Sequence, residues 1–306
     1  MVHLITMSKH GTIKRYSLII EKIGSNQYPS FDIIKDYLFE HGFEVSTRTV
    51  QRDIEQIRLE FGIEIKYHRY RNGYFIDTEA SINLNGFLRF LEIVNTATLL
   101  TESLKESKET LNYISFETHG DLRGIENLKP LLFAIRNHRK VSFSHEKFET
   151  GQQRKYSVQP YMLKEYQNRW YLVGIIGGTS EFRTFGVDRI LNLVVKDETF
   201  HPGSRTNPLE LFENTVGLTY SSHELEEVIL SFTPLQGKYV KALPFHKSQE
   251  IIEDDENELR VGLSIIPNYE FKQKIMMLGE TVTVLKPKWL ADEIKQSLEA
   301  TLKKYE

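Results

Sequence analysis

The chain has 306 residues, of which 40% are hydrophobic and 26% charged, with a formal net charge of −3 and no cysteine. Its length predicts two or three domains, and the absence of cysteine excludes disulfides, a thiolate nucleophile and cysteine-based metal sites. Because no apolar run is near the roughly 18 residues that span a membrane, and the first residues do not resemble a signal peptide, we expect a cytoplasmic protein with no membrane partner.

Residues 1–78 are expected to fold as three helices followed by a β-hairpin. Ser30 and Ser46 are residues of the type that caps a helix N-terminus, and each precedes apolar residues at helical spacing. Residues 63–67 alternate as a strand does, and Asn-Gly at 72–73 predicts a tight turn into a second strand. We interpret this segment as a winged helix-turn-helix.

The third predicted helix carries the segment Arg48–Ile54, R-T-V-Q-R-D-I, which resembles the recognition helix of DeoR-like and WYL-type regulators. Arg48 and Gln51 have side chains suited to reading base edges, and Thr49 and Arg52 side chains suited to holding phosphates. The predicted DNA contacts are the cap, the helix face and the wing: Ser46, Arg48, Thr49, Gln51, Arg52, Lys66, Arg69 and Arg71. Residues 1–78 contain 11 basic and 10 acidic side chains, so a solvated helix face crossed by ion pairs is the alternative interpretation.

Residues 79–135 are expected to form a helical linker with a net charge of −3. Apolar residues at helical spacing predict a long amphipathic helix over 84–115, and a second helix over 125–139 leads into the next domain. The predicted apolar stripe of the first helix is Leu84, Leu88, Leu91 and Val94. Such a face needs a partner, and both another subunit and a neighbouring domain would satisfy it.

Residues 136–205 are rich in β-branched, aromatic and aliphatic residues, with turn signals at 167–168 and 177–180. This pattern predicts a small antiparallel barrel or sandwich. The segment has a net charge of +5, whereas residues 206–306 have −6. A cationic domain in an acidic chain predicts an anionic ligand or partner, and the alternative is that the basic segment docks on the acidic one.

Two motifs in this segment, Arg169–Leu172 (R-W-Y-L) and Arg183–Ile190 (R-T-F-G-V-D-R-I), resemble the WYL domain. The resemblance implies a bacterial ligand-sensing module with an SH3/Sm-like barrel, usually fused behind a winged helix-turn-helix. Arginine suits bidentate capture of phosphate or carboxylate. The predicted ligand-binding residues are His145, Arg169, Tyr171, Arg183 and Arg189.

Some of these assignments have alternatives. The family often has Tyr at the position of His145, so this residue either alters ligand preference or is a structural histidine. The arginines either contact ligand or pair with Asp188 or Glu165. Trp170 and Leu172 share strand parity, and we expect both in the core.

Residues 206–306 follow a breaker-rich linker at 201–208 and show the order β-α-β-β-α-β with a final helix. This order predicts a ferredoxin-like domain. It also resembles the WCX extension that follows many WYL domains. The fold class is therefore α+β multidomain: winged helix-turn-helix, helical linker, central SH3/Sm-like β-barrel and C-terminal ferredoxin-like α/β domain.

No histidine pair has metal-ligand spacing, and no nucleophile elbow or phosphate-binding glycine loop occurs, so we expect no enzyme, cofactor or metal. We predict a ligand-responsive transcriptional regulator that binds a double-stranded DNA operator as a homodimer. Its effector would be a nucleotide, oligonucleotide or other phosphate-bearing anion. The alternative is a module that binds nucleotides or single-stranded nucleic acid through the basic barrel, without operator recognition.

Overall fold

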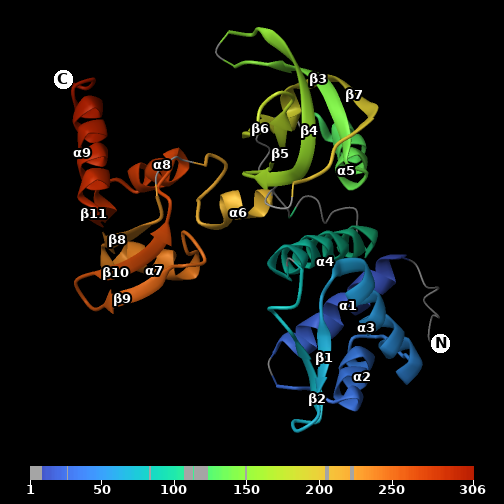
Figure 1. The fold of residues 1–306 in the computed structure, drawn as a ribbon. Coiled ribbons are helices and arrows are strands. Elements are labelled where there is room, and N and C mark those ends of the chain that lie inside the picture. The colour runs from blue at the N-terminus through green and yellow to red at the C-terminus, as the bar shows by residue number, and fades with distance from the viewer. Residues whose placement is uncertain are drawn as a thin grey trace. The chain divides into compact units, whose positions relative to one another are not determined.

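The computed structural model describes residues 9–25, 27–82, 84–106, 113, 123–148, 150–203, 207–220 and 224–306. It divides the chain into two compact units, Met1–Thr118 and His119–Glu306 (Figure 1). Helices and antiparallel sheets occur together, as the predicted α+β multidomain class requires.

The described residues of the first unit form three helices, a hairpin and a fourth helix: α1 (Lys9–Gly24), α2 (Phe31–Glu40), α3 (Thr47–Phe61), β1 (Ile65–His68), β2 (Gly73–Ile76) and α4 (Leu84–Glu106). Both predicted caps are confirmed. The Ser30 hydroxyl accepts from the backbone N–H of Ile33 at 3.4 Å, and the Ser46 hydroxyl accepts from that of Thr49 at 3.2 Å. These contacts satisfy amide donors that the first helical turn leaves without a partner.

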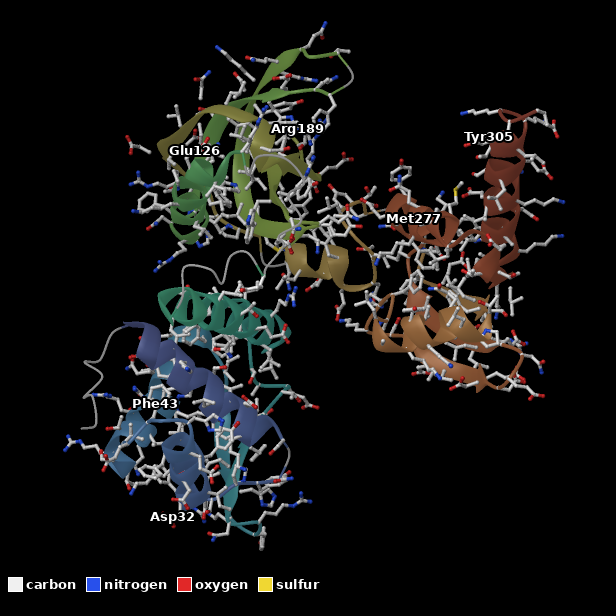
Figure 2. All side chains as sticks on the ribbon, turned by 180° about the vertical axis from the view of Figure 1, so that it is seen from behind. Asp32, Phe43, Glu126, Arg189, Met277 and Tyr305 are labelled. Carbon is white, nitrogen blue, oxygen red and sulfur yellow. The ribbon has the colours of Figure 1, made fainter. Side chains whose placement is uncertain are left out.

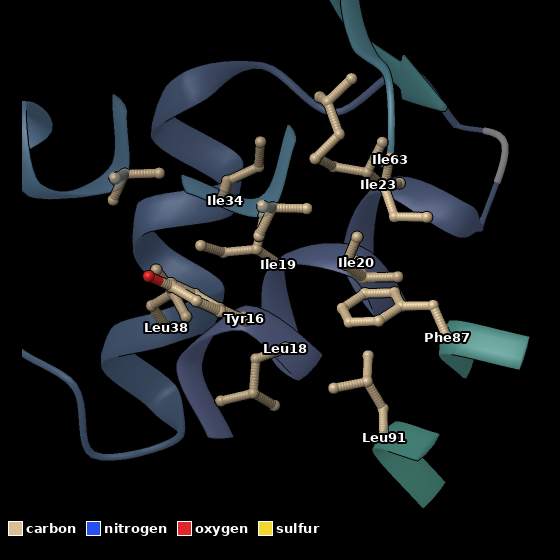
Figure 3. Packing of buried hydrophobic residues seen from close by; sticks show 13 residues of the cluster. Tyr16, Leu18, Ile19, Ile20, Ile23, Ile34, Leu38, Ile63, Phe87 and Leu91 are labelled. Carbon is tan, nitrogen blue, oxygen red and sulfur yellow. The ribbon is translucent and has the colours of Figure 1, made fainter. Parts of the chain in front are cut away.

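The core of the first unit forms where α1, α2 and α3 meet, and it includes Ile19, Ile34 and Ile57, all fully buried. Phe87 and Leu91 of α4 pack against this core (Figure 3). The predicted stripe of α4 was wrong at Leu88, which is 38% exposed. Leu91 of the predicted stripe is buried and Leu84 packs against the core, so the difference is that Phe87, four residues before Leu91, takes the buried position in place of Leu88.

The predicted two-residue turn of the hairpin is wrong. His68 pairs with Gly73, so the loop has four residues, Arg69–Asn72, and Gly73 begins the second strand. A Cβ atom on Gly73 would lie 1.8 Å from the carbonyl oxygen of Tyr28. Glycine is therefore required for close backbone approach and not for the turn, where Asn72 has the positive φ of 51°.

The second unit begins with the 3-10 segment η2 (Ile125–Asn127) and α5 (Leu128–Arg136) and continues with an antiparallel sheet in the order β6-β5-β4-β3-β7. Its strands are β3 (Arg139–Glu146), β4 (Gln153–Tyr166), β5 (Arg169–Ile176), β6 (Phe182–Gly186) and β7 (Ile190–Thr199). The 3-10 segment η3 (Val187–Arg189) joins the two edge strands, β6 and β7. Leu131 and Ala134 of α5 are fully buried in the same core as strand residues.

Leu172 is fully buried in this core, as predicted, but Trp170 is 38% exposed, so its predicted core position is wrong. Trp170 lies two residues after the β4–β5 turn at Gln167–Asn168, beyond the packed part of the sheet. Strand parity fixes the face of a side chain, but burial also requires a packing layer over it.

The expected linker, residues 79–135, divides between the two units. α4 packs on the core of the first unit, and α5 packs on the sheet of the second. The predicted long helix is described as α4 up to Glu106, and the remainder of its predicted range up to 115, apart from Tyr113, lies outside the described residues.

The C-terminal part of the second unit starts with α6 (Pro208–Glu213), after a linker in which residues 204–206 lie outside the described range. It continues with β8 (Glu226–Phe232), α7 (Pro234–Ala242), β9 (Glu250–Asp254), β10 (Leu259–Ile265), α8 (Tyr269–Met277), η4 (Gly279–Thr281), β11 (Val282–Lys286) and α9 (Lys288–Leu302). The predicted β-α-β-β-α-β order is confirmed, and the antiparallel sheet has the strand order β11-β8-β10-β9.

Candidate DNA-binding surface and ligand pocket

A buried ion pair fixes α3 on α1. Arg15 Nη2 donates to Asp53 Oδ1 at 2.9 Å, and Arg15 Nε contacts the other carboxylate oxygen. The two residues are only 4% and 1% exposed. Asp53 belongs to the predicted recognition motif, yet its charge is neutralised from inside the fold. It is therefore not available to pair with the arginines on the outer face of the helix.

The outer face of α3 presents Arg48, Gln51 and Arg52 to solvent. Within the described part of the chain, neither arginine takes part in an ion pair, so the predicted alternative of a face crossed by ion pairs is not observed. The hydroxyl of Thr49 lies 3.0 Å from that of Ser46, so these two side chains hold the start of the helix. The α3 surface can thus offer two guanidinium groups and one amide to an external partner.

The hairpin supplies less free positive charge than its sequence suggests. Lys66 Nζ donates to Asp77 Oδ2 at 2.6 Å, and this hydrogen bond raises the pKa of Lys66 and lowers the pKa of Asp77. The guanidinium of Arg71 lies 4.4 Å from the ring centroid of Tyr28, where it stacks on the aromatic face. Arg69 remains exposed at the loop, beside a 99% exposed Tyr70 that the sequence analysis did not select.

Two of the five predicted ligand residues gather around Asp188 in η3. Arg169 Nη1 lies 3.7 Å from Asp188 Oδ2, and Arg189 Nε lies 3.6 Å from Asp188 Oδ1. Both distances exceed hydrogen-bond length, so each guanidinium keeps donors for another acceptor. A Cβ atom on Gly186 would lie 2.5 Å from Asp188 Oδ1 and 2.7 Å from Arg189 Nη2, so a larger residue there would displace these two side-chain ends.

Arg183 and His145 lie beside the aromatic rings of the sheet. The guanidinium of Arg183 is 5.6 Å from the Tyr156 ring and 5.8 Å from the Phe185 ring. The His145 ring meets that of Phe185 edge to face at 5.4 Å. Burial, and secondarily the charge of Arg189, lower the pKa of His145 below its ordinary value of 6.5, which favours a neutral imidazole in the folded protein.

One cavity of about 310 Å³ lies on this sheet, close to η3. It is lined by Tyr171, Thr184, Gly186, Arg189, Leu218, Thr219, Tyr220 and Glu270. Tyr171 and Arg189 were predicted ligand residues, whereas Arg169, Arg183 and His145 do not line it (Figure 2 labels Arg189). Burial raises the pKa of Tyr171, so its hydroxyl stays protonated and can donate.

The wall formed by residues 218–220 and Glu270 was missed by the sequence analysis, because no local motif marks it. Tyr220 connects this wall to the sheet, since its hydroxyl donates to the carbonyl oxygen of Phe182 in β6. Glu270 lies in the first turn of α8. The cavity therefore combines groups from strands, from η3, from the segment before β8 and from α8.

Among the described residues, no group of three His, Asp or Glu side chains is arranged to hold a metal ion. No described helix has both the length and the apolar character to cross a membrane.

Comparison with known proteins identifies two domains. Residues 126–195 match the WYL domain, and residues 224–302 match the WCX domain. A search of curated proteins finds no match. Among solved structures, Proteasome accessory factor B/C (PafBC) of Arthrobacter aurescens is 16% identical with a TM-score of 0.31, over 96% of this chain and 47% of that one. The chain thus spans about half the length of that protein.

A second solved structure, described as a CRISPR Cas-related protein, is 12% identical with a TM-score of 0.39, over 99% of this chain and 87% of that one. At these values neither structure adds evidence about activity. The two domain matches agree with the sheet around Arg169–Leu172 and with the β-α-β-β-α-β region. The chain contains a WYL domain followed by a WCX domain.

Proposed function

We propose that this chain is a ligand-responsive transcriptional regulator. The first unit would be a winged helix-turn-helix that binds an operator in double-stranded DNA, with α3 as the recognition helix and the hairpin as the wing. The WYL domain, as an SH3/Sm-like barrel, would sense an anionic effector, and the WCX domain, as a ferredoxin-like fold, would complete the sensing unit. The WYL and WCX domains support this assignment.

The observation that carries the proposal is the burial of Asp53 against Arg15. It removes the acid of the motif from the surface and leaves Arg48, Gln51 and Arg52 exposed at the N-terminal half of α3. That half of a recognition helix faces base edges in the major groove. Arg48 and Gln51 would then read bases, and Arg52 would hold a phosphate.

The remaining predicted contacts take supporting positions. Ser46 and Thr49 would fix the helix start next to the DNA backbone, since their hydroxyl groups contact each other. Arg69 would be the main cation of the wing, because Lys66 is paired with Asp77 and Arg71 is stacked on Tyr28. This division predicts unequal effects for substitutions along the surface.

A homodimer follows from the size of the contact, because one small winged helix offers few groups for a specific site. Two copies would read half-sites whose spacing follows the helical repeat of DNA. An effector that binds one arrangement of the two readers more tightly than another would change operator affinity. The protein would act in the cytoplasm, where operator DNA is available.

The test is capture of genomic duplex fragments with the wild-type chain and with the double variant Arg48→Ala/Arg52→Ala. Arg58→Ala provides a matched control, because Arg58 is exposed in the last turn of the same helix. We expect a palindromic sequence to be enriched by wild type and by the control, and to be lost with the double variant. Capture that is unchanged in the double variant would contradict the assignment of α3.

A second candidate function uses the sheet itself. Arg183 is exposed beside Tyr156 and Phe185, and no ion pair of this arginine occurs in the described part of the chain. Such a combination suits stacking and backbone contact with a nucleotide or single-stranded nucleic acid. In that case Arg183→Ala, and not the α3 variants, would abolish nucleic-acid binding.

A further inference from the structure

Three of the residues that line the 310 Å³ cavity each carry a buried polar side-chain atom without a protein hydrogen-bond partner: Thr184 Oγ1, Arg189 Nε and Glu270 Oε2. Across the described residues, only three other buried side-chain atoms share this condition. Buried polar groups in native proteins are nearly always paired, because leaving one unpaired costs the desolvation of that group. Their concentration in one cavity indicates that the cavity binds a polar ligand.

The carboxylate of Glu270 is held in a fixed orientation. Its Oε1 accepts hydrogen bonds from the backbone N–H groups of Leu218, at 3.3 Å, and Thr219, at 3.0 Å. The Thr219 hydroxyl adds a third at 2.8 Å. Gly217, with φ of +88°, lets the loop approach closely, since a Cβ there would lie 2.8 Å from Glu270 Cγ. These contacts occupy one oxygen and leave Oε2 as the oxygen that can accept from a ligand.

Arg189 provides a donor on the sheet side of the cavity. Its guanidinium lies 3.9 Å from the ring centroid of Phe148 and 3.6 Å from Asp188, so it is positioned by both neighbours. Arginine donates only, and an ionised carboxylate accepts only. The cavity thus has a cationic donor in η3 and an anionic acceptor in α8, with the Thr184 hydroxyl as a further polar group.

We propose that this cavity selects a ligand carrying both an anionic group and a hydrogen-bond donor, namely an amino-bearing phosphate. The phosphate binds Arg189, and the amine donates to Glu270 Oε2. A phosphate ligand that lacks a hydrogen-bond donor leaves Glu270 Oε2 without a partner. Its negative charge is also repelled by the Glu270 carboxylate. This inference rests on the proposed function, because it takes the cavity as the site of the anionic effector.

The same geometry gives Glu270 a role in coupling. Glu270 belongs to the WCX domain, whereas Tyr171, Thr184 and Arg189 belong to the WYL domain. A ligand held by both sides connects the two domains. An anion that contacts Arg189 alone does not, so specificity and coupling depend on the same carboxylate.

The test measures binding of two probes to the purified full-length chain by calorimetry: phosphoethanolamine, and propyl phosphate, in which a methyl group replaces the ammonium. We expect wild type to bind phosphoethanolamine about tenfold more tightly, the size of a charge-assisted hydrogen bond. Glu270→Gln removes this preference and leaves propyl phosphate bound at least as tightly as in wild type. Glu280→Gln, an exposed change in the same domain, leaves the preference intact.

Arg189→Ala separates the inference from the proposed function. If wild type binds both probes equally and Arg189→Ala weakens both, the cavity is an anion site and the role given to Glu270 is wrong. If neither probe binds wild type at millimolar concentration, the anion site itself is wrong, and this inference with it. Thermal melting of each variant shows whether the fold is retained, so that a loss of binding is assigned to the site.

Discussion

The two arginine-rich regions of this protein differ in the burial and the pairing of their aspartate. In the first unit, Asp53 is 1% exposed and is paired with Arg15 inside the core. In the second unit, the Asp188 side chain is 24% exposed and lies 3.7 Å from Arg169 and 3.6 Å from Arg189. The arginines of α3 therefore keep their full charge for an external partner, whereas Arg169 of β5 and Arg189 of η3 share theirs with a neighbouring acid.

The buried pair has a structural role, whereas Asp188 affects how strongly its neighbouring arginines bind other anions. A buried pair holds two helices in place, and breaking it leaves an uncompensated charge in the core. An exposed pair contributes little to stability, but its acid competes with any anion for the same guanidinium groups.

Removing the buried acid should have the largest effect. Asp53→Ala leaves the Arg15 guanidinium buried without its partner, and we expect a loss of about 3–5 kcal/mol in the free energy of unfolding of the first unit. Urea unfolding followed by circular dichroism measures it. Asp188→Ala serves as the comparison and should cost less than about 1 kcal/mol. Equal losses in the two variants would contradict the distinction.

Removing the partly exposed Asp188 carboxylate should improve anion binding. In Asp188→Asn, Arg169 and Arg189 no longer share their charge, and we expect inorganic phosphate to bind about three- to fivefold more tightly, as calorimetry would measure. Asp197→Asn is a matched control, because Asp197 pairs with Arg139 at 3.0 Å outside the cavity. Unchanged or weaker binding in Asp188→Asn would show that Asp188 orients the arginines and does not reduce their affinity for phosphate.

The caps of α2 and α3 offer a comparison within the first unit. Ser46→Ala removes the hydroxyl that accepts a hydrogen bond from the backbone N–H of Thr49. We expect this change to lower the free energy of unfolding by about 1 kcal/mol and to weaken duplex binding. Ser30→Ala removes a cap whose hydrogen bond is longer, at 3.4 Å, on a helix with no predicted DNA contact. It should leave duplex affinity unchanged. An equal loss of DNA affinity in both variants would exclude a local role for the start of α3.

The smallest effect concerns pH. Because the pKa of His145 is lowered in the folded protein, the unfolded chain takes up a proton first as the pH falls. Stability due to neutral His145 is therefore fully present above its ordinary value of 6.5 and decreases below it. Melting temperatures of wild type and His145→Phe across this range test the sign. His246, whose pKa is lowered chiefly by burial, should leave part of the pH dependence in the variant.

Features with local causes could be predicted from the sequence. Ser30 and Ser46 mark the starts of α2 and α3 because a cap depends on a few consecutive residues. The β-α-β-β-α-β order of residues 206–306 could be predicted for the same reason, because the residue patterns of strands and helices are local. The motif Arg183–Ile190 also predicted Arg189 as a ligand residue. Arg189 lines the cavity because η3 directly follows β6.

Features that depend on distant contacts were missed or misread. The pairing of Arg15 with Asp53 joins residues 38 positions apart, and no spacing rule selects that partner. Gly73 was predicted as a turn residue. Glycine is needed there because the carbonyl group of Tyr28, in the loop between α1 and α2, leaves no room for a side chain. Glu270 reaches the cavity only because its loop contacts hold it there. In each case the tertiary fold, and not the local sequence, decides the role.

The measurement that tests the central claim most directly is the salt dependence of duplex DNA affinity for Arg48→Ala and for Arg169→Ala. If the free guanidinium groups of α3 bind DNA and the paired ones of the sheet do not, Arg48→Ala weakens binding and Arg169→Ala leaves both affinity and slope as in wild type. Arg52→Ala should lower the slope by about one unit, because Arg52 is assigned to a phosphate. A reduced slope in Arg169→Ala together with an unchanged one in Arg52→Ala would contradict the account and place nucleic-acid binding on the WYL domain.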